Sequence, residues 1–231
     1  MAKLILLPGV GADGRLFEPQ REAFPDLLVP DWLPPEPEES LPHYASRMAE
    51  AMKPLFADDG PILLGGVSFG GMVAYEAARV LKPAAVIQIA SCRSRRAVRG
   101  LLRVMSPLAS AALPSVLGAA KMMSPVGLEL LTHMKTKERD YFVAMFRESD
   151  STFITWALTS ILNWEPSTPP EAPVRQIHGR RDLLLSVENI EADEIVPTGG
   201  HLINMTHRSE VNAFIRKVVD SAVAQYRPPT T

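Results

Sequence analysis

One short stretch, GGVSFGG at residues 65–71, constrains the fold of this chain more than any other. An apolar run, PILL, leads into it, and a segment of helix-forming residues, MVAYEAARVL, leads out of it. Glycine loses more backbone entropy on folding than other residues, so four glycines around one serine need a steric reason. A sharp turn from a strand into a helix supplies that reason. We predict that Gly66 and Gly70 clear space for the turn, and that Gly65 and Gly71 allow the strand and helix to pack closely.

Further apolar runs alternate with helical segments along much of the chain. The predicted strands are residues 3–9, 26–32, 61–68, 84–91, 174–179 and 193–200. Strands that alternate with helices over short connections imply crossovers between parallel neighbours. The sequence therefore predicts an α/β fold, doubly wound, with a mostly parallel sheet of about six strands.

This alternation stops after residue 92. Residues 93–165 show no convincing strand pattern, are rich in Ala, Leu and Met, and are divided by prolines. We interpret this segment as a helical cap inserted into a core that residues 1–92 and 166–231 form. Its arginines (Arg93, Arg95, Arg96, Arg99 and Arg103) are either a solvated face or a site that attracts an anionic acyl thioester. Its methionines (Met105, Met122, Met123, Met134 and Met145) are either plain core or an adaptable apolar surface.

Composition argues against several classes of protein. The formal net charge of −2 gives no basic field for binding nucleic acid or an anionic membrane. No run approaches the roughly 18–20 apolar residues of a membrane span, and the short apolar run after Lys3 lacks a signal-peptide cleavage site. The single cysteine, Cys92, can form neither an internal disulfide nor a cysteine metal cluster. That usage favours a reducing compartment, and we expect a cytoplasmic protein in which Cys92 is a small buried hydrophobe.

Ser68 is the first candidate for chemistry. It is the centre of Gly66-Val67-Ser68-Phe69-Gly70, which matches G-x-S-x-G in the strand–turn–helix setting that presents a nucleophilic serine. A serine hydroxyl needs a base to take its proton. His201 follows the last predicted strand, so it should lie at the same edge of the sheet as Ser68. His207, near the start of the last helix, is the competing candidate, although hydrogen bonding at the helix end is its more ordinary role.

The base in turn needs an acid, and an oxyanion needs donors. Asp182 follows the predicted strand at residues 174–179 and is our candidate acid, with Asp150 in reserve. The backbone N–H of Phe69, at the start of a helix, is one candidate oxyanion donor. Val10, in the loop after the first strand, is the second, and Gly11 is its alternative. His178, His201 and His207 lack zinc-ligand spacing, so no metal is expected.

Four segments, taken in order, resemble the α/β-hydrolase fold superfamily over nearly the whole chain: LLPGVGADGRLF, GGVSFGG, IHGRRD and GGHLINMTH. The chain looks most like the small capped esterase and thioesterase branch. The resemblance implies a serine hydrolase that cleaves a small-molecule carboxylic ester or thioester through a Ser68, His201 and Asp182 triad, without a cofactor. A catalytically silent binding protein of this fold, and a C–C hydrolase or lyase that uses the same triad, are the alternatives.

Three departures from the family pattern accompany this resemblance. Pro8-Gly9 stands where the family usually has His-Gly. The first predicted strand resembles the third strand of the family, so we expect the family's first hairpin to be missing. The interval between Asp182 and His201 is short, so the helix there should shrink to about one turn. None of these departures removes a catalytic group.

Overall fold

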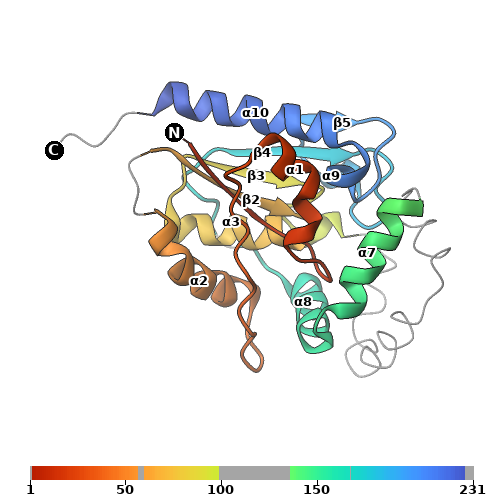
Figure 1. Cartoon of the computed structure of the whole chain (residues 1–231). Coiled ribbons are helices and arrows are strands. Elements are labelled where there is room, and N and C mark those ends of the chain that lie inside the picture. Colours follow the sequence, from red (N-terminus) through yellow and green to blue (C-terminus); the bar gives the residue numbers. More distant parts are fainter. Residues whose placement is uncertain (1, 57–59, 99–135, 167, 227–231) are drawn as a thin grey trace.

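The computed structural model describes residues 2–56, 60–98, 136–166 and 168–226 (Figure 1). Its centre is one parallel sheet of five strands, in the spatial order β1-β2-β3-β4-β5. The strands are β1 Lys3–Leu7, β2 Ile62–Val67, β3 Ala85–Ile89, β4 Val174–Gly179 and β5 Glu194–Val196. Because the strands are parallel and follow chain order, all their carboxyl ends lie at one edge of the sheet. The predicted α/β class and parallel sheet are confirmed.

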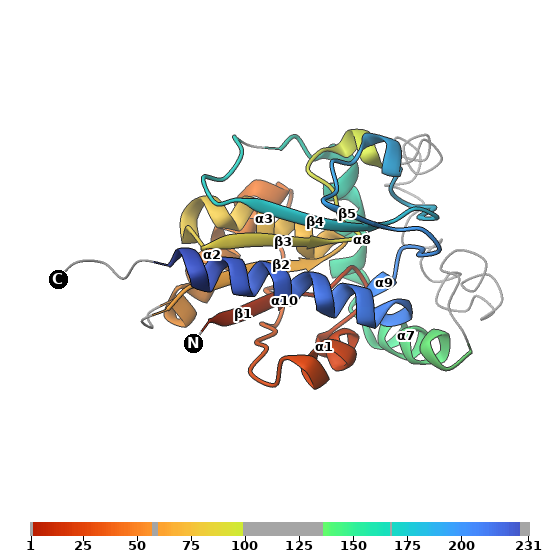
Figure 2. The ribbon, with the colours of Figure 1, turned by 90° about the horizontal axis from the view of Figure 1, so that it is seen from above.

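Helices cover both faces of this sheet. The α-helices are α1 Glu18–Ala23, α2 Leu41–Met52, α3 Phe69–Leu81, α7 Thr136–Glu148, α8 Ser151–Asn163, α9 Ile203–Thr206 and α10 Arg208–Gln225. The 3₁₀ turns are η1 Gly14–Phe17, η2 Lys53–Phe56, η3 Arg95–Ala97 and η4 Val187–Asn189. In Figure 1, α10 lies above the sheet and α2 and α3 lie below it. Figure 2, seen from above, shows α10 lying over the sheet roughly along the direction of the strands. None of the helices in the described ranges has the length and apolar character of a membrane span.

The two faces carry separate apolar cores. On one face α2, α3 and α8 pack around residues such as Tyr44, Phe69 and Trp164. On the other face α10 and η1 pack around Phe17 and Phe214. Strand β2 is buried along its whole length, as expected for a central strand with helices on both sides. The packed sheet therefore fixes the positions of the loop residues that follow its strands.

Local sequence explains how the helices next to the site begin. Ser40 caps α2 by accepting the N–H of His43 at 3.4 Å, and Pro42 occupies the first turn. Helix α3 spans Phe69–Leu81, so it includes the helix-forming residues that follow the glycine-rich turn, and it ends on Lys82 in the left-handed conformation.

The apolar run at residues 26–32 is not a strand, so the sheet has five strands rather than about six. Leu28 alone makes a bridge, with hydrogen bonds of 3.0 Å to the backbones of Leu4 and Leu6. In a parallel ladder the next donor from this segment would be residue 30. That residue is Pro30, which has no N–H, so pairing stops after one residue.

The described part of residues 93–165 consists mainly of η3, α7 and α8, and it holds no strand beyond an isolated bridge from Val98 to Leu185. Helices α7 and α8 lie near the end of the sheet where the strands finish (Figures 1 and 2). The division into a core and a cap insertion stays a prediction.

Only some of the arginines and methionines of residues 93–165 lie in the described part of the chain, so only these can be compared with the two interpretations given for each set. Arg99, Arg103, Met105, Met122, Met123 and Met134 lie outside the described residues. Arg93 contacts the carbonyl oxygen of Val174 at 3.3 Å, and Arg95 pairs with Glu165 at 2.5 Å. Met145 is fully buried in the core under α10. These residues fit the ordinary interpretations, a surface pair and a core side chain.

Candidate active site

The turn between β2 and α3 holds Ser68 in an unusual conformation. Its backbone has φ of 53° and ψ of −118°, a region that side-chain-bearing residues rarely adopt. A Cβ on Gly66 would lie 2.6 Å from the carbonyl oxygen of Leu7, and a Cβ on Gly70 would overlap the same carbonyl group. These contacts are with backbone, which cannot move aside. Only glycine fits at either position, as the sequence predicts.

Residues of the β3 region hold this turn in place. The N–H of Ser68 donates to the carbonyl oxygen of Ile89 at 3.0 Å. The Ser91 hydroxyl donates to the carbonyl oxygen of Ser68 at 2.7 Å. Backbone strain persists only where surrounding contacts over-determine it, and these two bonds supply that restraint.

The structure brings the three predicted side chains into one hydrogen-bonded series. His201 Nε2 lies 2.9 Å from Ser68 Oγ, and His201 Nδ1 lies 2.7 Å from Asp182 Oδ2. Ser68 follows β2, Asp182 follows β4 and His201 follows β5, all at the carboxyl edge. The carboxylate can only accept, so Nδ1 carries the proton and Nε2 is left to accept from the serine hydroxyl. This arrangement can take a proton from Ser68.

Asp182 is held in its ionised form. It is fully buried, and burial alone would raise its pKa. The positive charge of His201 in its protonated form and the adjacent side chains of His178 and His201 outweigh burial, so the pKa of Asp182 lies well below its usual value. Its Oδ1 also accepts the N–H groups of Leu184 at 2.8 Å and Leu185 at 3.0 Å.

His178 is a neighbour of this series that sequence reasoning missed. It lies in β4, is fully buried, and its Nε2 is 3.1 Å from Asp182 Oδ2. Neither ring nitrogen has a hydrogen bond of good geometry with another described residue. The four-residue spacing in HGRRD, where a tight turn follows the strand, is the signal that would have revealed this contact.

The candidate oxyanion donors flank Ser68. Phe69 is the first residue of α3 and is fully buried. The loop after β1 comes close to the serine, because a Cβ on Gly9 would lie 3.6 Å from Ser68 Cβ. Val10 follows Gly9 in that loop, and Gly11 has a left-handed φ of 71°. The assignment of the Phe69 and Val10 N–H groups, with Gly11 as alternative, stays a prediction.

The two reserve candidates have other partners. The His207 ring contacts Thr198 Oγ1 at 3.0 Å and Thr206 Oγ1 at 2.9 Å, just before α10. Asp150 caps α8 by accepting the N–H of Thr152 at 2.9 Å. Asp150 is therefore a helix cap. The His207 side chain makes no cap hydrogen bond to α10, so its predicted helix-end role is wrong.

One group of side chains in the described ranges has metal-ligand spacing. The ligand atoms of Glu36, Glu39 and His43 lie within 4.8 Å of one another. Arg47 already pairs with both carboxylates, at 3.2 Å to Glu36 and 2.8 Å to Glu39. The Arg47 guanidinium thus balances one of the two carboxylate charges of this group.

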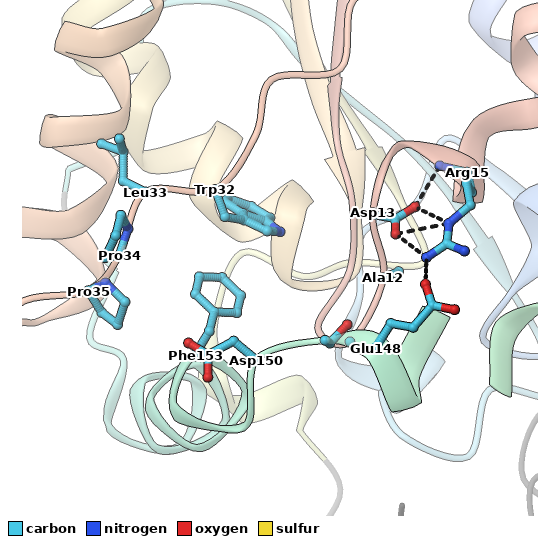
Figure 3. Close-up of a pocket in the computed structure, with 12 residues that line it drawn as sticks. Ala12, Asp13, Arg15, Trp32, Leu33, Pro34, Pro35, Glu148, Asp150 and Phe153 are labelled. Atoms are coloured by element: carbon cyan, nitrogen blue, oxygen red, sulfur yellow. Dashed lines mark hydrogen bonds and ion pairs between the residues drawn. The ribbon is translucent and has the colours of Figure 1, made fainter. Parts of the chain in front are cut away.

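A cavity of about 460 Å³ opens beside the serine turn (Figure 3). It lies between the loop after β1, residues 32–35, and the corner where α7 meets α8. Ser68 and His201 do not line it, but Gly11 does. Its aromatic residues Trp32 and Phe153 contact the ring of Phe69, with centroids 5.6 and 6.1 Å away.

The fold and this edge of the sheet define the class of protein. A parallel sheet carries a serine on a glycine-cleared turn, and a histidine and an aspartate follow later strands. The chain belongs to the alpha/beta hydrolase family, whose family model matches residues 4–214. The predicted superfamily is confirmed.

Solved structures share this fold at low sequence identity. An esterase from Thermogutta terrifontis is 19% identical, with a TM-score of 0.73, covering 96% of this chain and 91% of its own. A hydrolase from Oleispira antarctica is 13% identical, with a TM-score of 0.71 and coverages of 95% and 91%. An esterase from Exiguobacterium antarcticum is 13% identical, with a TM-score of 0.68 and coverages of 94% and 92%. Comparison with curated proteins gives no match.

Proposed function

We propose that this protein is a serine hydrolase that cleaves a carboxylic ester or thioester of a small molecule. One observation carries the proposal: Ser68, His201 and Asp182 form an unbroken series with contacts of 2.9 and 2.7 Å. Esterases among the solved structures of the same fold support the reaction class. The assembled series argues against a silent binding protein, which would not need it.

Acylation starts at Ser68. Its Oγ attacks the acyl carbon while His201 Nε2 takes the hydroxyl proton. The tetrahedral intermediate collapses, the bond to the alcohol or thiol breaks, and His201 returns the proton to that leaving group. Ser68 is then esterified to the acyl group.

Deacylation repeats these steps with water. His201 takes a proton from water, the resulting hydroxide attacks the acyl carbon, and the proton returns to Ser68 Oγ as the carboxylic acid leaves. Asp182 holds the imidazole in the required tautomer and stabilises its positive charge in both halves. Its low pKa keeps it ionised throughout.

Backbone amides complete the proposed site. The N–H groups of Phe69 and Val10, or of Gly11 in place of Val10, would donate to the oxyanion of each tetrahedral intermediate. Location in the cytoplasm, and a cap formed by residues 93–165, remain predictions from the sequence.

A fluorophosphonate probe tests the proposal directly. It should label Ser68 in the wild-type protein, with the site read from the labelled peptide by mass spectrometry, and leave Ser68→Ala unlabelled. Turnover of p-nitrophenyl esters should fall by about 10⁴-fold or more in that variant. Melting temperatures of both proteins serve as the control for folding. Full ester turnover by folded Ser68→Ala would overturn the assignment.

A further inference from the structure

The cavity beside the serine turn has two unlike walls. One wall is apolar, made by Trp32, Leu33, the two prolines that follow and Phe153. The other wall carries charge, from Asp13, Arg15 and Glu148 (Figure 3). The apolar wall continues toward the reaction centre, because Trp32 and Phe153 pack on the ring of Phe69, next to Ser68.

The cavity lining as a whole repels anions. Besides Asp13 and Glu148 it includes the carboxylate of Asp150, which Figure 3 shows beside Phe153. These three carboxylates and the Arg15 guanidinium have a formal net charge of −2. Arg15 is already engaged, since its Nη2 contacts Asp13 at 2.6 Å and Glu148 at 2.5 Å. The hydrogen bond from Arg15 holds the pKa of Asp13 below its usual value, so this carboxylate stays ionised.

The apolar wall contains an unused donor. Trp32 Nε1 is shielded from solvent and has no hydrogen-bond partner among the described residues. In Figure 3 it is on the side of the indole that faces the loop holding Ala12 and Asp13, across the cavity. A buried N–H without an acceptor is costly. A small rotation of the indole that opens Nε1 to the cavity would therefore be favoured when a ligand brings an acceptor. By contrast, the nearby Trp156 Nε1 donates to the carbonyl oxygen of Glu39 at 2.9 Å.

The geometry points to this cavity as the substrate pocket for an uncharged aromatic group that carries a hydrogen-bond acceptor. The ring stacks against Trp32 and Phe153, and the acceptor receives the Trp32 N–H. This inference rests on the proposed function and narrows it. Esters with a neutral aryl or arylalkyl group are favoured, and thioesters whose anionic carrier would enter the cavity are disfavoured by Asp13, Glu148 and Asp150.

Ligand binding measured on a variant that should not turn over substrate tests this inference independently of the catalytic proposal. Isothermal titration calorimetry on Ser68→Ala would compare phenylacetamide, which is neutral, with phenylacetate, which has nearly the same shape and is anionic. The amide should bind, and the carboxylate should bind at least tenfold more weakly. Equal affinity for both, or no binding of the amide at its solubility limit, would overturn the inference whether or not Ser68 is the nucleophile.

Two further substitutions test the assigned contacts in the same background. Trp32→Phe keeps a ring and removes the donor, so phenylacetamide should bind about three- to tenfold more weakly, as expected for one neutral hydrogen bond. Trp156→Phe is the matched control, because it removes an indole N–H of the same aromatic cluster that does not line the cavity, and affinity should stay unchanged. Glu148→Gln should improve phenylacetate binding. Unaltered amide affinity in Trp32→Phe, or unaltered phenylacetate affinity in Glu148→Gln, would refute the respective contact.

Discussion

Replacing Ser68 by glycine should stabilise the fold relative to replacing it by alanine. Both substitutions remove the hydroxyl and its contact with His201, so they differ only in the Cβ. Alanine keeps the strain of φ at 53° and ψ at −118°, which is worth about 1–3 kcal/mol. Glycine relieves that strain, but its greater conformational entropy in the unfolded chain lowers the free energy of unfolding by about 0.4–1 kcal/mol. The free energy of unfolding of Ser68→Gly should therefore exceed that of Ser68→Ala by about 1 kcal/mol.

Thermal and urea unfolding of the purified variants would measure this difference. For a chain of this size, about 1 kcal/mol corresponds to about 2–4 °C in Tm. The control pair is Ser46→Gly and Ser46→Ala, at an exposed position inside helix α2. There the order should reverse, because glycine disfavours helix by about 1 kcal/mol relative to alanine. If Ser68→Gly is no more stable than Ser68→Ala while the Ser46 pair behaves as stated, the turn stores no strain.

Further predictions concern the same edge of the sheet. Gly70→Ala should lower the free energy of unfolding by about 3 kcal/mol, measured by urea titration, because its Cβ meets rigid backbone. Asp182→Asn should lower kcat about 10⁴-fold in a steady-state ester assay, through the wrong histidine tautomer; a loss of tenfold or less would contradict this role. Because the pKa of Asp182 is depressed on folding, its contribution to stability is present above about pH 4 and is lost as pH falls below that. The Tm difference between wild type and Asp182→Asn should accordingly shrink on acidification from pH 5 to pH 3. The kcat/KM for ester should rise with pH through one ionisation around pH 6–8 and then level off, and EDTA should leave it unchanged; loss of activity on chelation would reopen metal chemistry.

The place of the triad candidates follows from sequence because each stands directly after a strand. Parallel topology then brings Ser68, Asp182 and His201 to one edge without any knowledge of side-chain contacts. The turn around Ser68 is equally local, because the clash at Gly66 and Gly70 arises within a few residues of sequence and from the adjacent strand. Local patterns of this kind are what a single sequence expresses best.

Features that depend on contacts between distant residues, or on a single backbone N–H, could not be predicted from the sequence. Residues 26–32 have strand-like composition, but the absence of one N–H at Pro30 ends the pairing after Leu28. His178 reads as an ordinary strand residue until the turn after β4 folds Asp182 back toward it. Trp32 lines the cavity only because α8 brings Phe153 against it, with ring centroids 5.4 Å apart.

The groups that contact Ser68 come from distant parts of the chain, so its environment forms only after much of the chain has folded. The turn is restrained by Ile89 and Ser91, and the base lies 133 residues further along the sequence. During synthesis the serine therefore emerges well before the histidine that would take its proton. If Ser68 is the nucleophile, as proposed, a chain that lacks His201 would have an inert hydroxyl at this position. Ser68 would become reactive only once the loop after β5 brings His201 to it. Reaction with a fluorophosphonate, sampled during refolding, would thus report when the contact between Ser68 and His201 forms.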